Sequence, residues 1–195
     1  MKNVRAIAAT QLARVFANGH SFDADSLARM KELDSRDLGL IKEICYGTLR
    51  HYFLLDALVA PLLKKPLSKK DADIYALLLA GLYQLRFMQT PVHAAINSSV
   101  DACKDLGKLW AKGLVNAVLR NLVRSELTLA ENFSDTPPAH RASHPDWLYQ
   151  QIECDWPAQF EQIIDYNNSP PPMTLRLEAE PVSYTHLTLP TISDV

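Results

Sequence analysis

Residues 74–85 read IYALLLAGLYQL, and this stretch decides the fold of the chain. Apolar side chains occur on every face of a helix drawn through it, so such a helix cannot lie at a surface with one side in water. Asp71 or Asp73 is the expected start, because a carboxylate is favoured in the first turn of a helix. We therefore expect residues 74–85 to be the central helix of a bundle.

The segments on both sides have the apolar periodicity of amphipathic helices that could enclose this centre. They cover residues 4–18, 35–63 with one break, 91–107 and 111–125. Ser35 is the expected cap of the second segment, and Pro91 is the expected first helical residue of the third. Gly19 and Gly107 supply left-handed stops. The pattern predicts one all-α domain over residues 1–133.

Periodicity breaks at residues 134–138, which read SDTPP and mark a domain boundary. Two short helices are expected beyond it, at about 145–155 and 157–167. Residues 173–177, MTLRL, alternate like the first strand of another domain. We therefore predict that residues 134–181 are a helical connector and the beginning of a second domain.

The last fourteen residues, 182–195, resemble a translated sequencing-library adapter rather than natural protein. Residues 182–191, VSYTHLTLPT, are what GTC TCT TAT ACA CAT CTG ACG CTG CCG ACG encodes, and that string resembles a transposase-type adapter. In such an adapter an A, index bases and GTG TAG follow, and the chain continues with Ile192 and ends in Val195. We expect a non-native tail here and a gene that continues past Pro181.

Charge is divided unevenly between the two parts of the chain. Residues 1–130 hold 18 Lys and Arg against 12 Asp and Glu, whereas residues 131–195 hold 2 against 10. Such asymmetry indicates an anionic partner for the basic part, although charge that only serves solubility would look the same.

No pattern of catalytic or metal-binding residues occurs in the sequence. There is no glycine-rich phosphate loop, no GxSxG, no HExxH and no CxxC, and the six histidines are scattered. The three cysteines have no metal-like spacing, and Cys45 and Cys103 fall on apolar stripes as core residues. No signal peptide or apolar stretch of membrane length is present, so we expect a cytoplasmic protein that does not contact membranes. We predict no catalytic, cofactor-binding or metal-binding residues.

Basic residues form a row on the predicted helices. Lys2 and Arg5 lie at the start of the first helix, where the helix dipole disfavours positive charge. Others follow the last bundle helix and the one before it, namely Lys112, Arg120 and Arg124, with Lys104 and Lys108. A solvated face is one interpretation. The other is a surface that follows phosphates, since rows of Lys and Arg build such surfaces.

Four segments, in order, resemble the helical NusB-type RNA-binding domain: residues 45–50 (CYGTLR), 81–85 (GLYQL), 91–97 (PVHAAIN) and 112–120 (KGLVNAVLR). Such domains occur alone, as a transcription antitermination factor, and as the N-terminal domain of bacterial small-subunit rRNA cytosine-C5 methyltransferases of the RsmB (Sun) type. Residues 144–148 (HPDWL) and 167–176 (NNSPPPMTLR) resemble the connecting region of those methyltransferases. A free-standing factor would end near residue 135.

The resemblance implies the RNA-binding N-terminal part of a 16S rRNA cytosine-C5 methyltransferase, with small-subunit rRNA and the missing methyltransferase domain as partners. Together with the excess of basic residues and the placement of Lys2 and Arg5 against the helix dipole, it leads us to expect RNA contacts from Lys2, Arg5, Lys112, Arg120 and Arg124. The family's S-adenosylmethionine loop and two active-site cysteines belong to an α/β domain that this chain lacks. No cofactor and no activity are therefore expected of the chain itself. The alternatives are a stand-alone antitermination factor that joins RNA to a ribosomal protein, and a bundle that binds only protein.

Overall fold

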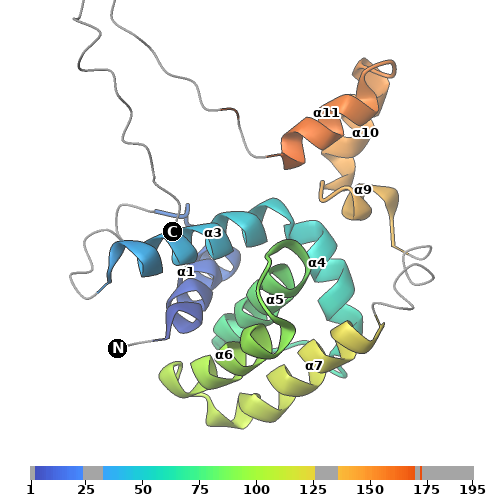
Figure 1. The fold of residues 1–195 in the computed structure, drawn as a ribbon. Coiled ribbons are helices and arrows are strands. Elements are labelled where there is room, and N and C mark those ends of the chain that lie inside the picture. Colours follow the sequence, from blue (N-terminus) through green and yellow to red (C-terminus); the bar gives the residue numbers. More distant parts are fainter. Residues whose placement is uncertain (1–2, 24–32, 126–135, 170–171, 173–195) are drawn as a thin grey trace, which may run out of the picture.

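The computed structural model describes residues 3–23, 33–125, 136–169 and 172, and every regular element in these ranges is helical (Figure 1). This confirms the predicted fold class. None of the described helices is long and apolar enough to cross a membrane. The predicted strand at 173–177, the predicted tail at 182–195 and Lys2 lie outside the described residues.

Among the described residues, six α-helices belong to the bundle: α1 (Val4–Asn18), α3 (Ser35–Arg50), α4 (Tyr52–Val59), α5 (Ala72–Phe87), α6 (Val92–Asp105) and α7 (Lys112–Ser125). Short 3-10 turns join some of them, at Ala60–Leu62, Lys69–Asp71 and Leu109–Ala111. Three further helices follow: α9 (Pro138–Arg141), α10 (Asp146–Asp155) and α11 (Phe160–Asn168).

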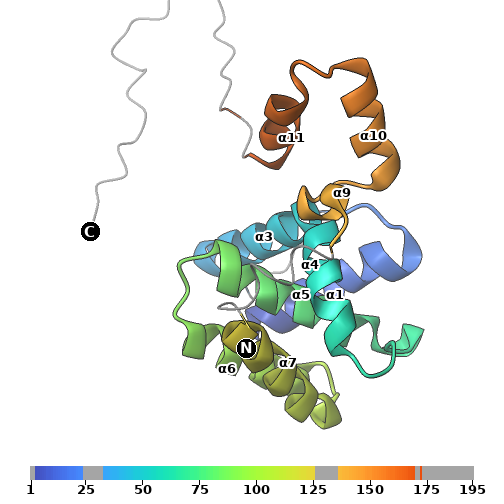
Figure 2. The ribbon, with the colours of Figure 1, turned by 90° about the vertical axis from the view of Figure 1, so that its right-hand side faces the viewer.

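Helix α5 is the centre of the bundle, as the sequence predicts (Figures 1 and 2). The helices α1, α3, α4, α6 and α7 all pack against it. Ten positions, from Ile74 to Gln84 with Tyr75 excepted, are buried. Complete burial of a leucine side chain such as Leu77, Leu78 or Leu79 stabilises a fold by about 1.5–3 kcal/mol. The apolar character on all faces therefore reflects contact with a neighbour on every side.

Two glycines of the sequence motifs allow helices to approach closely. A Cβ atom on Gly47 of α3 would lie 1.9 Å from Cζ of Tyr83 on α5, so only glycine leaves room for this ring. The Tyr83 hydroxyl donates a 2.6 Å hydrogen bond to Oε1 of Glu43. A Cβ on Gly81 would lie 2.9 Å from Cδ1 of Leu119 on α7. These positions determine how α3, α5 and α7 fit together.

The helix ends differ by one residue from two predictions. Asp34, not Ser35, caps α3, and its side chain accepts a 2.7 Å hydrogen bond from the backbone N–H of Asp37. An aspartate caps as well as a serine, and here it lies one position earlier. Pro91 is extended and lies at the cap position, so α6 begins at Val92. The left-handed stops at Gly19 and Gly107 are confirmed, with φ of 66° and 70°.

The three C-terminal helices stand at one end of the bundle, with α9 against α4 (Figure 2). A tight turn at residues 142–144 lies between α9 and α10, and Ser143 has a φ of 58°. Asn168 Nδ2 donates a 2.8 Å hydrogen bond to the Ala142 carbonyl, and Asn167 Nδ2 lies 3.1 Å from Nε2 of the buried His144. Ser143 Oγ also lies 3.4 Å from Nδ1 of His51, so the turn contacts the bundle directly.

Candidate nucleic-acid interface

Helix α7 carries three of the predicted RNA-binding residues. Arg120 and Arg124 are exposed, and Lys112 is half-buried. Arg124 follows Arg120 by four residues, which is one turn, whereas Lys112 precedes Arg120 by eight residues, which is about two turns. The Nε atom of Arg120 donates a 2.8 Å hydrogen bond to Oδ1 of Asn116, which holds the guanidinium along the helix. All three residues thus lie on one helix, with Arg120 and Arg124 one turn apart and exposed.

Arg5 lies on a different helix, α1, and has a structural contact. Its Nε atom donates a 3.0 Å hydrogen bond to Oε1 of Gln84, which is completely buried in α5. Burial lowers the pKa of the Arg5 guanidinium, and the negative charge of Asp37 partly opposes this shift. The bond to Gln84 explains why a cation is tolerated at the start of a helix.

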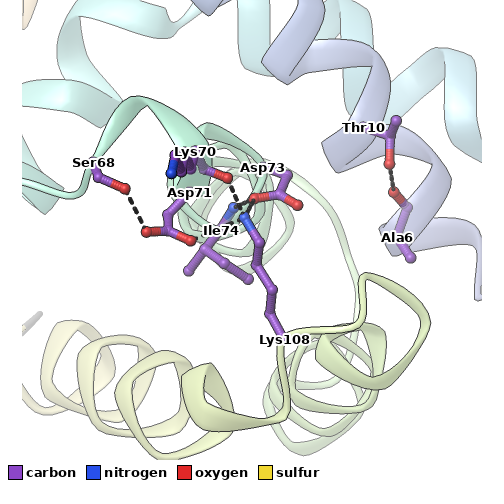
Figure 3. Close-up of polar contacts among 8 residues, drawn as sticks. All are labelled: Ala6, Thr10, Ser68, Lys70, Asp71, Asp73, Ile74 and Lys108. Carbon is purple, nitrogen blue, oxygen red and sulfur yellow. Dashed lines mark hydrogen bonds and ion pairs between the residues drawn. The ribbon is translucent and has the colours of Figure 1, made fainter.

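Lys108 does not join the row that its spacing from Lys104 suggested. Figure 3 shows its Nζ atom between Asp71 and Asp73 at the start of α5, at 3.0 and 2.5 Å from an Oδ1 atom of each. It also donates to the carbonyl of Lys70. Desolvation acts to lower the pKa of Lys108, but the hydrogen bonds with Asp73 and Asp71 outweigh it and raise the pKa. Lys108 therefore ties the α6–α7 connection to α5, whereas Lys104 is exposed.

Four lysines that the sequence reasoning missed lie between α4 and α5, in the segment 62–70, LLKKPLSKK. Lys64, Lys65, Lys69 and Lys70 are all exposed, and among the residues that the structure describes none of these side chains forms an ion pair. The two adjacent lysine pairs were the signal that could have identified them.

A groove of about 310 Å³ separates the first of these pairs from α7. Lys64 and Lys65 line one wall, and Ala117 and Asn121 of α7 line the other. Arg124 follows Asn121 by three residues and so lies on the same side of the helix. We call Lys64, Lys65, Lys112, Arg120 and Arg124 the α7 face. Lys64 and Lys65 in one wall of the groove, and the exposed Arg120 and Arg124 on the helix that forms the other wall, are suited to phosphate contacts.

Cys45 and Cys103 are buried, whereas Cys154 is exposed. Within the described ranges no three His, Cys, Asp or Glu side chains gather as metal ligands would. Burial raises the pKa of the Cys45 thiol to about 12 and also raises that of Cys103. Both thiols therefore stay protonated near neutral pH and are poor nucleophiles.

Comparison with known proteins gives matches over both parts of the chain. The NusB family model matches residues 2–124, and the model of the ferredoxin-like domain of RsmF/B-like methyltransferases matches residues 144–188. The second match lies beyond the NusB region, in the segment whose motifs resemble the methyltransferase connection. The resemblance found in the sequence is thereby confirmed.

Several curated relatives bear the name ribosomal RNA small subunit methyltransferase B. The protein from Pseudomonas putida is 43% identical over 175 residues, and that from Vibrio cholerae is 41% identical over 175 residues. Each alignment covers 90% of this chain and 40% of the relative. The protein from Pseudomonas syringae pv. tomato is 44% identical, with 90% and 39% covered. This chain thus spans about two fifths of the length of these relatives, and over residues 2–124 it belongs to the NusB family.

Proposed function

We propose that this chain holds small-subunit ribosomal RNA as the RNA-binding part of an S-adenosylmethionine-dependent rRNA cytosine-C5 methyltransferase in the cytoplasm. The observation that carries the proposal is the α7 face, where Arg120 and Arg124 are exposed on the helix that faces Lys64 and Lys65 across a groove. The excess of basic residues in residues 1–130 and the names of the relatives support it.

The cationic side chains of the α7 face contact phosphates, which gives affinity with little sequence preference. Lys2 and Arg5 remain in the proposed set. Arg5 uses its terminal guanidinium nitrogens toward RNA, while its Nε holds Gln84. Cofactor binding and methyl transfer are assigned to a separate methyltransferase domain, which is a further partner of residues 134–181. In this proposal the chain itself neither binds S-adenosylmethionine nor transfers methyl groups.

Salt dependence of RNA binding by the full chain tests the proposal. If about four cationic groups meet phosphates, the logarithm of affinity for a small-subunit rRNA hairpin falls against the logarithm of salt concentration with a slope of roughly −3. The double variant Lys112→Glu, Arg120→Glu loses about two contacts and should flatten that slope by about 1.5. Its affinity should fall for every RNA alike.

A charge-matched control distinguishes a local effect from a change in net charge. Arg36→Glu with Arg141→Glu makes the same change in charge at exposed positions on α3 and α9, away from α7. We expect this control to keep the steep slope. Binding that does not respond to salt, or a Lys112 and Arg120 reversal without effect, would contradict the proposal and favour a bundle that binds only protein.

A further inference from the structure

A second hollow, of about 560 Å³, opens on the other side of the 62–70 segment. We call it the aromatic pocket, because rings from three helices line it: Phe16 of α1, Tyr52 of α4 and Tyr75 of α5. Leu63 and Leu67 complete its apolar wall. Its volume is in the range of pockets that hold small ligands.

The rings of the aromatic pocket are held in place by the fold. The centroids of Phe16 and Tyr52 are 5.0 Å apart, with their planes inclined by 35°. The Tyr75 hydroxyl donates a hydrogen bond to Oδ1 of Asp56. Burial raises the pKa values of Tyr52 and Tyr75, so both phenols stay neutral. The pocket therefore presents fixed, uncharged aromatic surfaces.

The mouth of the pocket is cationic. Lys69 lines it and also lines an adjoining hollow of about 260 Å³ between α1 and α5, where Arg14 and Lys70 lie. All three side chains are exposed. The hollow holds one carboxylate, Asp73, which is paired with Lys108, against these three cations. A ligand that fits must combine a flat apolar part with negative charge beside it.

The pocket also adjoins the groove beside α7, from which the 62–70 segment separates it. Leu63 and Leu67 line both the aromatic pocket and the groove beside α7. A polyanion held by Lys64 and Lys65 thus reaches the mouth of the pocket by passing over a single chain segment, the one that carries Pro66. One bound polyanion can therefore contact both the α7 face and the mouth of the pocket.

We propose that the aromatic pocket receives one unpaired base of the RNA that the α7 face holds, with the adjacent phosphates on Lys69 and Arg14. This inference rests on the proposed function. A base is flat and stacks on aromatic rings, and single-stranded RNA is recognised by unstacked bases that insert among such side chains. An apolar peptide side chain would pack against the apolar wall, but it would bring no negative charge to Lys69, Arg14 and Lys70.

Two RNA hairpins that differ in one nucleotide test the inference. One carries a single bulged 2-aminopurine, whose fluorescence reports stacking, and the other is fully paired. The full chain should bind the bulged hairpin about 5- to 150-fold more tightly, which corresponds to about 1–3 kcal/mol for one stacked base. The fluorescence of the bulged base should change on binding.

The variant Ala17→Trp blocks the pocket without removing core atoms, since Ala17 is exposed and lines the pocket. It should bind both hairpins with the lower affinity of the paired one, and the fluorescence change should disappear. His93→Trp adds the same ring at an exposed site on α6 and should keep the preference. Lys69→Glu removes the cation at the mouth and should also reduce the preference. If the circular dichroism spectrum shows that Ala17→Trp alters the fold, the Lys69→Glu variant tests the base site in its place.

The outcomes separate this inference from the proposed function. Equal binding of both hairpins by the unchanged chain, or a preference that survives Ala17→Trp and Lys69→Glu, would overturn the base site and leave RNA binding intact. In that case a protein segment, and not an RNA base, is the expected occupant of the pocket. Failure to bind either hairpin at low salt would instead overturn the proposed function itself. The Lys112 and Arg120 reversal should weaken both hairpins equally and keep their ratio.

Discussion

Arg5 Nε donates a 3.0 Å hydrogen bond to the side-chain oxygen of Gln84, a residue with no exposed surface. The bond joins α1 to the central helix across 79 positions of sequence. Arg5→Ala leaves this buried oxygen without its donor, which costs about 1–3 kcal/mol. We therefore expect a lower free energy of unfolding, measured by urea denaturation.

Arg5→Lys separates the structural role of Arg5 from its charge. Lysine keeps the positive charge but lacks the planar Nε donor. This variant should lose stability while it binds RNA nearly as well as the unchanged chain. If Arg5→Ala instead weakens RNA binding and leaves stability intact, Arg5 is an RNA contact alone.

Gly47 should not tolerate even one methyl group. Gly47→Ala forces the added Cβ against the Tyr83 ring, and overpacking of this kind costs about 1–3 kcal/mol. Gly39→Ala in the same helix is the matched control, because a Cβ at that position would lie more than 4 Å from the described side chains of every other helix. We expect that control to gain about 0.5–1 kcal/mol from helix propensity. Equal thermal midpoints for the two variants would disprove the close contact.

The cluster around Lys108 should make stability sensitive to acid. Hydrogen bonds from Ser68 and Lys108 lower the pKa of Asp71 in the folded chain. A carboxyl group with a lowered pKa stabilises the fold above its unfolded pKa, and this contribution is lost as pH falls through the folded value. The urea midpoint should therefore drop below about pH 4. Lys108→Met should show a shallower drop over the same interval, and parallel curves would contradict this.

His51 should add a second, milder pH dependence near neutrality. Burial lowers its pKa, and the charges of Arg50 and Arg86 lower it further. The folded state therefore disfavours the protonated ring, so stability present above about pH 6.5 is lost as pH falls. His51→Phe keeps the stack on Phe87, whose ring centroid is 4.0 Å away, and cannot titrate. The thermal midpoint of this variant should change less between about pH 7 and about pH 5.

The sequence predicted the helices well because the apolar pattern of each segment is compatible with only one position in a helical bundle. Residues 74–85 can only be a central helix, and the structure confirms it. Contacts between distant segments were not predictable in this way. Lys108 resembled a member of a basic row with Lys104. However, α6 ends at Asp105, before Lys108. The two carboxylates that pair with Lys108 precede this lysine by 35 residues or more in the sequence. The aromatic pocket likewise combines residues from Phe16 to Tyr75.

The contacts of α1 have a consequence for the order in which the chain folds during synthesis. The backbone N–H of Asn3 donates to Asp105, which is 102 residues later, whereas Asn168 and Ala142 are separated by only 26. At about 5–20 residues per second, a ribosome needs about 5–20 s to make α6 after α1. The turn at 142–144 can close almost as soon as its partners emerge. Helix α1 packs against α3, α5 and α6, all of which are made after it. The contacts of α1 are therefore complete only when α6 has been made, and until then part of its apolar face is open to chaperones and to other nascent chains.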